Sequence, residues 1–391
     1  MKTYNDALKY LDWLCVFGIK EGLERIKKLA AALGQPQNFY RTIHVAGTNG
    51  KGSVCAMLAE MLKAQGFKVG LFTSPHLESY CERIKIDGEN ISENDFAEMI
   101  FRVKNCNVVA THFEVLTAAA FLYFKIREVD FAVIEVGLGG MFDSTNIITP
   151  ELSIITNVAL DHENILGDLK NIALNKAGII KEKIPVVTGA QGLPLEIIRA
   201  VAEEKNSPLH EVTAPANVKL NLRGDYQKFN AAIAIKAAQL LGIDDEKIFS
   251  ALARVEWSGR FEVLKNSSEV VVIDGAHNPH GAEALRQSLD KNFPHGKQVW
   301  LFGVLKDKDF AGMIKILFRP NDFVFVTKPN SERAASPETL CEILQGLGIE
   351  CAAVEDNFEA VERLKNFSCD VKIIAGSLYL IGAVRKKIMS K

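Results

Sequence analysis

The sequence predicts an α/β protein with two domains, each built on a mostly parallel β-sheet. A chain of 391 residues is too long for one ordinary hydrophobic core, which favours two domains. Short apolar runs alternate with segments of helical periodicity, as in α/β folds. A glycine-rich turn at residues 47–53 separates an apolar run from a helical pattern, which is the setting of a phosphate-binding loop.

The first domain is expected to hold five strands, each an apolar run bounded by turn residues. A helix is expected at 54–65, because its apolar residues recur with helical spacing. The segment 1–14 also has a helical pattern of polar and apolar residues. The strands are expected at residues 42–46, 69–73, 131–137, 152–158 and 185–189.

A second β/α series is expected to form a smaller, Rossmann-like domain. Two helices, at 231–241 and near 244–254, come before a hinge at 257–259, so the domains are predicted as 1–258 and 259–391. The segment DGAHNPHG stands at the end of the first expected strand of this domain, where a dinucleotide-binding domain has a GxGxxG motif. This difference disfavours a dinucleotide site. Strands are expected at 270–274, 298–304, 323–328 and 371–376.

The loop at 47–53 has the residue types that cradle a nucleotide phosphate. Glycines let backbone N–H groups converge, the following helix N-terminus attracts anions, and Lys51 adds a full positive charge. The usual pattern places Ser or Thr directly after the lysine, whereas Gly52 intervenes here before Ser53. The predicted ATP-binding residues of the loop are Gly47, Thr48, Asn49, Gly50, Lys51, Gly52 and Ser53.

Polar residues follow the expected strands at Ser74, Glu135, Asp161 and His162. Ligands gather at the carboxyl ends of parallel strands, and these oxygen and nitrogen donors suit Mg²⁺. Taken singly, Ser74 is typical of a helix cap and Glu135 of a polar strand end, and a lone His162 is more often a core or surface histidine than a metal ligand. Their shared position at strand ends favours the metal site.

Longer sequence motifs are more specific than the glycine-rich loop alone. The segment 44–53 reads HVAGTNGKGS and follows FGIKEGLERI at 17–26. Others are TSPHLESYCERIKIDGENIS at 73–92, THFEVLTAAAF at 111–121, EVGLGG at 135–140, LDHENILGD at 160–168, KAGIIK at 176–181, GRFEV at 259–263, DGAHNPHGAEAL at 274–285, FGVLKDKD at 302–309 and AGSLYLIGAVR at 375–385. In this order, and over nearly the whole chain, they resemble the folylpolyglutamate synthase and dihydrofolate synthase family of the Mur ligase superfamily. The resemblance implies a P-loop domain of the Mur ligase central type followed by the Rossmann-like domain.

The resemblance also implies roles for particular residues. Ser74, Glu135 and His162 match positions that hold magnesium, at two sites, and Lys176 matches a carbamylated lysine that orients the metal. From pattern alone Lys176 is a solvated lysine early in an expected helix. The base and ribose of ATP are expected to contact Asn230, Arg260, Asp274 and His277, with Arg260 reaching phosphate when the domains close. The catalytic set is Lys51, Asp161, His162, Lys176 and Arg260, although Arg260 taken alone reads as an interdomain ion pair.

The acceptor residues are implied by the same matches. Phe113 and Phe142 are candidates to sandwich a flat pterin ring, although either alone is more often a core residue. The segment 73–92, rich in turn residues, is expected to be a mobile loop over this pocket. The acceptor set is Gly18, Ile19, Lys20, Glu21, Thr111, His112, Phe113, Glu114, Phe142, Asp143 and Ser144.

Two segments depart from the family pattern. After EVGLGG the family usually continues with arginine, leucine and aspartate, whereas this chain has Met141, Phe142 and Asp143. The loss of a cation beside the reaction site bears on the choice of acceptor. Asn175 stands where the family often has glutamate before the lysine, so the surroundings of Lys176 differ too.

The sequence therefore predicts an ATP-dependent ligase that adds L-glutamate to dihydropteroate or a reduced folate through an acyl phosphate. The alternatives are a Mur ligase for another carboxylate, a folate-binding homologue of weak activity, and a GTPase-type switch, for which no NKxD-like word is evident. Peptidoglycan-precursor Mur ligases generally carry a uridine-nucleotide domain before the loop, and only 46 residues precede Gly47.

The composition indicates which classes of partner and which cellular compartment to expect. A net charge of −2, without a basic block, disfavours nucleic acid. Seven cysteines without a CxxC pair, and no apolar run of membrane-spanning length, favour a cytoplasmic protein that meets no membrane. Members of the family are commonly monomers, which is the expectation for this chain.

Overall fold

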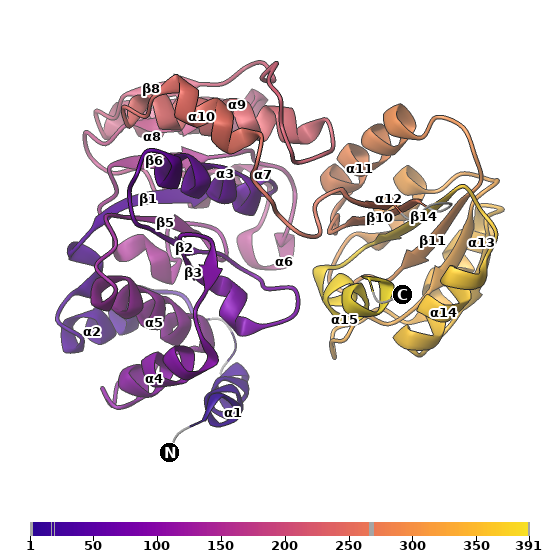
Figure 1. Ribbon diagram of the computed structural model, residues 1–391, viewed down its shortest axis with the longest axis horizontal. Coiled ribbons are helices and arrows are strands. Elements are labelled where there is room, and N and C mark those ends of the chain that lie inside the picture. Colours follow the sequence, from indigo (N-terminus) through magenta and orange to yellow (C-terminus); the bar gives the residue numbers. More distant parts are fainter. Residues whose placement is uncertain (1–2, 17, 19, 266–269, 390–391) are drawn as a thin grey trace. The chain divides into compact units, whose positions relative to one another are not determined.

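The structure is a computed structural model that describes residues 3–16, 18, 20–265 and 270–389 (Figure 1). Its contacts divide the chain into two compact units, Met1–Leu220 with Phe229–Val255, and Asn221–Lys228 with Glu256–Lys391. The sequence-based limits of 1–258 and 259–391 differ from these units chiefly by Asn221–Lys228, which packs with the second unit. Each unit is described below by itself.

The first unit contains a mixed sheet of eight strands in the order β4-β3-β2-β5-β1-β6-β7-β8. From β2 to β8 the neighbouring strands are parallel, and β3 and β4 add an antiparallel edge. Strands β1, β2, β5, β6 and β7 correspond to the five expected strands. The bounds are β1 Arg41–Ala46, β2 Val69–Phe72, β3 Ile84–Ile86, β4 Glu89–Asn90, β5 Phe131–Glu135, β6 Leu152–Ile155, β7 Val186–Thr188 and β8 Leu209–Glu211.

Helices cover both faces of this sheet, with α3 and α10 on one side and α4 and α5 on the other (Figure 1). Side chains fix several of the helix starts, as in α5, where Thr111 and Glu114 form a capping box. The bounds are α1 Tyr4–Cys15, α2 Glu24–Ala32, α3 Lys51–Ala64, α4 Glu93–Lys104, α5 His112–Ile126, α6 Glu163–Leu166, α7 Leu169–Ala177, α8 Gly192–Glu204, α9 Tyr226–Leu240 and α10 Asp245–Leu252. Short 3-10 helices are η1 Pro36–Asn38, η2 Tyr80–Arg83 and η3 Ser144–Ile147.

The expectation of a mobile loop at 73–92 is wrong for its second half. Residues 80–90 form η2, β3 and β4, and β3 pairs with β2 in the sheet. Turn residues mislead here because a short two-stranded edge has too few apolar residues to show a period. The segment is therefore a built edge of the sheet next to the strand ends.

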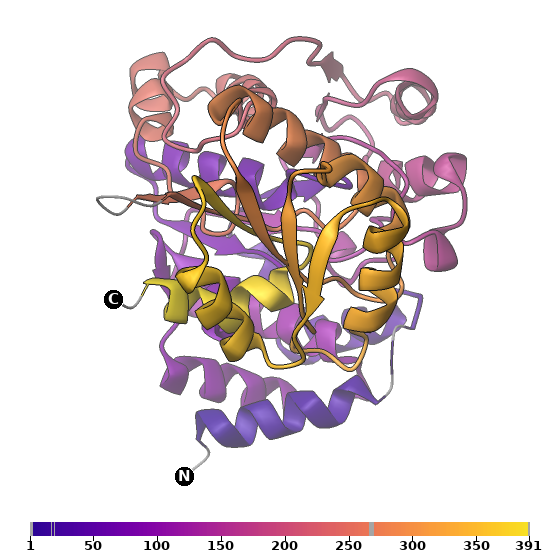
Figure 2. The ribbon, with the colours of Figure 1, turned by 90° about the vertical axis from the view of Figure 1, so that its right-hand side faces the viewer.

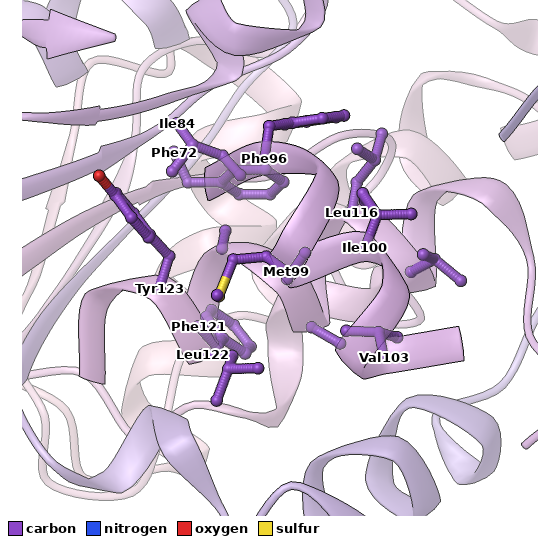
Figure 3. Packing of buried hydrophobic residues seen from close by; sticks show 14 of the residues in the cluster. Phe72, Ile84, Phe96, Met99, Ile100, Val103, Leu116, Phe121, Leu122 and Tyr123 are labelled. Atoms are coloured by element: carbon purple, nitrogen blue, oxygen red, sulfur yellow. The ribbon is translucent and has the colours of Figure 1, made fainter. Parts of the chain in front are cut away.

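A large apolar cluster joins α4, α5 and the sheet (Figure 3). Phe72 and Ile84 come from β2 and β3, Phe96 from α4 and Phe121 from α5, and all four are fully buried. Truncating one such phenylalanine to alanine typically costs about 3–5 kcal/mol of stability. This core fixes the strands whose carboxyl ends carry the site.

The second unit is a six-stranded sheet in the order β13-β12-β11-β14-β10-β9, parallel except for β9. Figure 2 shows its strands lying between helices on either side. The four expected strands correspond to β10, β11, β12 and β14. The bounds are β9 Glu262–Lys265, β10 Val270–Asp274, α11 Pro279–Asn292, β11 Gln298–Phe302, α12 Phe310–Leu317, β12 Phe323–Val326, α13 Pro337–Gly346, β13 Glu350–Ala353, α14 Asn357–Asn366, β14 Val371–Ala375 and α15 Leu378–Met389.

Within the described residues, the helices are too short or too polar to cross a membrane.

Candidate active site

The glycine-rich loop connects β1 to α3 and is fastened to the end of β6. Thr48 N–H donates to Asn157 O at 2.9 Å, Asn49 N–H donates to Asn157 Oδ1 at 2.9 Å, and Thr156 Oγ1 donates to Asn49 O at 2.7 Å. A Cβ on Gly47, where φ is +147°, would lie 1.9 Å from Thr156 Oγ1. Only glycine therefore allows this close approach of the loop to the strand end.

Helix α3 begins directly after the loop, with Gly50 at its N-cap in the left-handed region. Among the described residues no side chain caps this helix, and Gly52 and Ser53 are buried in its first turn. Lys51 Nζ donates to Gly47 O and Thr48 O, both at 3.2 Å, so its charge lies over the loop. An uncapped helix start beside a lysine favours the binding of an anion.

Lys176 joins this loop from α7. Its Nζ donates to Gly47 O at 2.9 Å, and the residue is only 5% exposed. Burial first, and then the charge of Lys51, lower the pKa of Lys176 to about 7, against the opposing pull of Asp161 and Asp143. The solvated-lysine interpretation is therefore wrong, and so is the expected place early in a helix, because α7 ends at Ala177.

Ser74 and Glu135 meet at the ends of the neighbouring strands β2 and β5. Ser74 N–H donates to Glu135 Oε2 at 3.0 Å, and Glu135 is 4% exposed. A serine and a carboxylate are oxygen ligands of the kind that Mg²⁺ takes, and Mg²⁺ needs only one or two protein ligands beside phosphate oxygens. In the described part of the chain, no three His, Cys, Asp or Glu side chains form a ready metal cage. The site thus fits a metal held jointly with nucleotide phosphate.

Asp161 and His162 lie in the turn between β6 and α6. His162 N–H donates to Asp161 Oδ1 at 2.9 Å, while its Nε2 lies 3.9 Å from the same oxygen. His162 adopts a φ of +54°, which is uncommon outside glycine. The Asp161 side chain is 8% exposed and the His162 side chain 31%, so the imidazole is the more open to ligand.

The predicted acceptor residues at 111–114 have structural partners. Glu114 is buried, accepts Thr111 N–H at 2.7 Å, and pairs with Arg25 Nε at 3.0 Å. Arg25 in turn donates to the carbonyls of Lys20 and Glu21, which fastens the segment near Gly18 to α5. Ile19 lies outside the described residues. Glu114 is thus held in a helix cap and an ion pair.

His112, the first residue of α5, contacts a partly buried group of side chains on the β2–β3 connection. Its Nε2 lies 3.1 Å from Tyr80 OH, and Arg83 Nε donates to His76 Nδ1 at 2.8 Å. Burial, followed by the charge of Arg83, lowers the pKa of His112 to about 4 and that of His76 to about 3. Both imidazoles are therefore neutral at ordinary pH.

Asp143 is the centre of a second buried group. It accepts Leu138 N–H at 2.9 Å and Thr145 N–H at 3.0 Å, and burial raises its pKa. His44 Nε2 lies 2.8 Å from Thr145 Oγ1. Sequence reasoning assigned no role to His44 or Thr145, although His44 opens the HVAGTNGKGS word and Thr145 follows the 142–144 set.

The aromatic candidates differ in their surroundings. Phe113 is partly buried and stacks on Phe72 with centroids 5.8 Å apart, and a Cβ on Gly137 would lie 2.4 Å from its ring. Phe142 is 45% exposed and Met141 38% exposed, in the loop after β5. Ser144 Oγ lies 2.7 Å from Thr117 Oγ1, so Ser144 is tied to α5.

Asn230 lies against the phosphate loop within the first unit. It is 5% exposed, and a Cβ on Gly50 would come within 2.4 Å of its Oδ1. The sequence placed Asn230 at the base and ribose, whereas the structure brings it to the turn that carries the phosphate amides.

In the second unit, Asp274 ends β10 and organises its surroundings. It accepts Tyr226 OH at 2.8 Å, Phe261 N–H at 2.7 Å and Ala276 N–H at 2.8 Å, and burial raises its pKa. A Cβ on Gly275 would lie 2.3 Å from Arg260 Nη1, so the guanidinium lies over that glycine. His277 Nδ1 is 2.8 Å from Gly275 O. The structure thus brings Arg260, Asp274 and His277 together, with Tyr226 as a member that the sequence analysis missed.

Comparisons with known proteins agree with this geometry. The Mur ligase middle domain matches residues 45–186, and the Mur ligase glutamate ligase domain matches residues 259–378. Fold and site thus define a Mur ligase. Within that class, the chain belongs to the folylpolyglutamate synthase/dihydrofolate synthase family: it is 36% identical to the dihydrofolate synthase/folylpolyglutamate synthase of Bacillus subtilis, over 99% of each chain.

Solved structures of the family have the same fold. Escherichia coli FolC in complex with DHPP and ADP superposes with a TM-score of 0.90 at 30% identity, over 98% of this chain and 97% of that chain. The bifunctional enzyme of Yersinia pestis, complexed with AMPPNP and Mn ion, gives a TM-score of 0.88 at 30% identity, over 99% and 98% of the two chains.

Proposed function

We propose that this protein is an ATP-dependent ligase that joins L-glutamate to the carboxylate of a folate or of dihydropteroate. The observation that carries the proposal is the loop at 47–53, where an uncapped helix start, Lys51 and the buried amine of Lys176 converge on Gly47. Relatives over the whole chain that are named for both synthase activities support a bifunctional enzyme.

In the first step, an acceptor carboxylate oxygen attacks the γ-phosphorus of ATP, giving an acyl phosphate and ADP. Negative charge is spread over the transferring phosphoryl oxygens, so the protein contributes mainly position and positive charge. We assign the phosphate contacts to the amides of the 47–53 loop and to Lys51. Asn230, packed against Gly50, holds the turn that presents those amides.

Ser74 and Glu135, with His162, are the residues proposed to hold the divalent metal with the nucleotide. When bound, the metal neutralises phosphate charge and orients the oxygens that react. The Mn-bound family structure supports divalent-metal use. Two Mg²⁺ sites remain our proposal for this chain.

Lys176 is proposed to be carbamylated. Its neutral amine would attack CO₂ and lose one proton, giving a carboxylate-like anion in place of a cation. A lowered pKa, caused by burial and by Lys51, provides the neutral amine that this addition requires. The carbamate would then turn an oxygen ligand toward the metal.

In the second step, the glutamate amine attacks the acyl carbon, phosphate leaves, and the amine loses a proton. Asp161 and His162 are the candidate proton acceptors. From the second unit, Arg260, Asp274 and His277 are proposed to act on the same nucleotide, with Arg260 supplying charge to the transferring phosphate.

The proposed acceptor set remains that of the sequence analysis. Its buried members are Thr111, Glu114, Asp143 and Ser144, and Phe113 is partly buried. We also propose a cytoplasmic location, since the seven cysteines are free thiols that a reducing compartment preserves. The proposal of a monomer rests on the resemblance to the family alone.

The test is glutamate-dependent ADP release with Mg²⁺ and ATP, comparing dihydropteroate with tetrahydrofolate. Turnover with both acceptors supports a bifunctional enzyme, and turnover with tetrahydrofolate alone supports a dedicated polyglutamate synthase. Lys51→Ala should abolish ADP release, while Lys63→Ala, a lysine in the last turn of the same helix, should retain it. Normal turnover by Lys51→Ala would contradict the loop assignment.

One observation favours a second candidate, a folate-binding homologue of weak activity. The exposed Met141 stands in the acceptor loop where the family usually has arginine. Binding of both acceptors without ADP release would favour this candidate.

A further inference from the structure

The turn at residues 259–261 places Arg260, and its backbone is unusual. Gly259 has a φ of +71° and Phe261 a φ of +49°, so two of its three residues are left-handed. A non-glycine residue in this region costs about 1–3 kcal/mol, and such strain persists only where surrounding contacts impose it. The turn must therefore be held from outside.

One set of contacts holds the turn toward β10. Gly275 N–H donates to Gly259 O at 2.9 Å, and Phe261 N–H donates to Asp274 Oδ2 at 2.7 Å. Arg260 Nη1 also donates to Gly259 O at 3.1 Å. The guanidinium of Arg260 is thereby folded back over its own turn.

A second set comes from the other side. Glu262 Oε2 accepts Gly259 N–H at 2.9 Å, and the same carboxylate takes two hydrogen bonds from Arg385 of α15. These join Arg385 Nε to Oε2 at 3.1 Å and Nη2 to Oε1 at 2.7 Å. The side chains of Glu262 and Arg385 are 18% and 19% exposed, so this two-hydrogen-bond ion pair, called the Arg385 fork below, is largely shielded from water.

We propose that Glu262 and Arg385 are positioning residues for Arg260. Arg385 fixes the carboxylate of Glu262, Glu262 fixes the amide of Gly259, and Gly259 sets the backbone from which Arg260 extends. The inference rests on the proposed function, in which Arg260 supplies charge to the transferring phosphate. The proposal adds that the guanidinium of Arg260 is correctly placed only when α15, which carries Arg385, is packed in its position in the second unit. This helix lies more than 100 residues further along the chain.

The magnitude follows from the geometry of electrostatic catalysis. A misplacement of roughly 1 Å at a reacting centre can cost on the order of 100-fold in rate. Glu262→Ala removes the acceptor of the Gly259 amide, and we expect kcat for ADP release to fall by about 10- to 100-fold on that basis. The KM for ATP should change less, because the phosphate loop of the first unit is intact.

The experiment compares kcat, KM and melting temperature for Arg260→Ala, Glu262→Ala, Arg385→Ala and the double variant Arg260→Ala/Glu262→Ala. Asp290→Ala is the matched control, since it breaks an ion pair with the buried Arg286 on α11. We expect the control to lose stability with kcat within about twofold of wild type. The double variant should be no slower than Arg260→Ala, because Glu262 acts only through Arg260.

Rescue provides a further readout. Arg385→Lys keeps the charge without the fork, so its kcat should lie between those of Arg385→Ala and wild type. Glu262→Gln keeps an oxygen for the Gly259 amide and serves if the alanine variant does not fold; it should be less impaired than Arg385→Ala.

Two results would overturn the proposal: a Glu262→Ala variant no slower than Asp290→Ala, or a double variant whose loss is the product of the single losses. An Arg260→Ala enzyme with wild-type kcat is a different failure, since it would remove the proposed role of Arg260 itself.

Discussion

Replacement of Lys176 by methionine is the most informative perturbation of the first unit. Methionine keeps most of the volume of the lysine stem in this buried position but removes the amine that donates to Gly47 O. If the lysine is carbamylated, the variant loses an anionic oxygen ligand. If it is a simple cation, the variant loses one positive charge near Lys51.

The lowered pKa gives the size of the effect. With a pKa of about 7, the Lys176 amine is roughly nine-tenths neutral at pH 8, against well under 1% for a lysine at 10.5. The amount of reactive neutral amine is thus about 300-fold larger than for an ordinary lysine. Protonation of the amine in this position costs roughly 5 kcal/mol more than in water, because of burial and the charge of Lys51.

The sign of the pH dependence follows. The unfolded chain holds the proton of Lys176 up to about pH 10.5, whereas the folded chain releases it near pH 7. Between these values the unfolded state binds more protons, so folded stability rises with pH in the uncarbamylated protein. The methionine variant should lack this part of the slope.

The assay is ADP release after removal of CO₂ and after addition of bicarbonate, with the ¹³C signal of labelled carbamate as a direct readout. We expect wild-type activity to rise with bicarbonate and Lys176→Met to be inactive at every concentration. Short carboxylic acids should partly restore a Lys176→Ala enzyme. Lys181→Met, a partly buried lysine on the same segment, is the control and should retain turnover.

Full turnover by Lys176→Met would refute the carbamate role and leave Lys176 as a structural donor to the loop. Loss of activity without bicarbonate dependence or a carbamate signal would refute it as well, since a cationic amine would then suffice.

Three further predictions address the loop, the acceptor site and acid stability. Gly47→Ala should weaken ATP binding at least tenfold in a titration, because its Cβ would lie 1.9 Å from a threonine oxygen, while Gly66→Ala, also at positive φ but with open space around it, should bind normally. Met141→Arg restores a cation on a 38% exposed position and should lower the KM of the anionic acceptor several-fold with little change in melting temperature; an unchanged KM would separate this residue from acceptor choice. The pKa values of His76 and His112 are lowered to about 3 and 4 in the folded protein, so below about pH 6.5 the unfolded chain binds more protons than the folded chain. The free energy of unfolding should therefore fall from pH 6.5 to pH 4. This fall should be smaller in the variant His76→Gln/His112→Gln.

The local sequence sufficed for most of the elements. Buried parallel strands are near-continuous apolar runs, so β1, β2, β5, β6 and β7 stand out from the chain, and so do β10, β11, β12 and β14. The short strands at or next to the sheet edges, β3, β4, β8, β9 and β13, were missed, since they lack such a run. The phosphate loop was visible because its glycines have a local, steric cause.

The sequence by itself thus determined the two α/β units, the loop at 47–53 and the strand ends that carry Ser74 and Glu135, because apolar periodicity and glycine placement are local properties. The burial of Lys176 against Gly47 was decided only by the tertiary structure, and so were the capture of Glu114 by Arg25 and the fork of Arg385 on Glu262. Burial, partner choice and pKa depend on groups that are distant in the chain and meet only when the core closes. The sequence therefore predicts which groups take part in the reaction, and the packed fold determines their protonation and position.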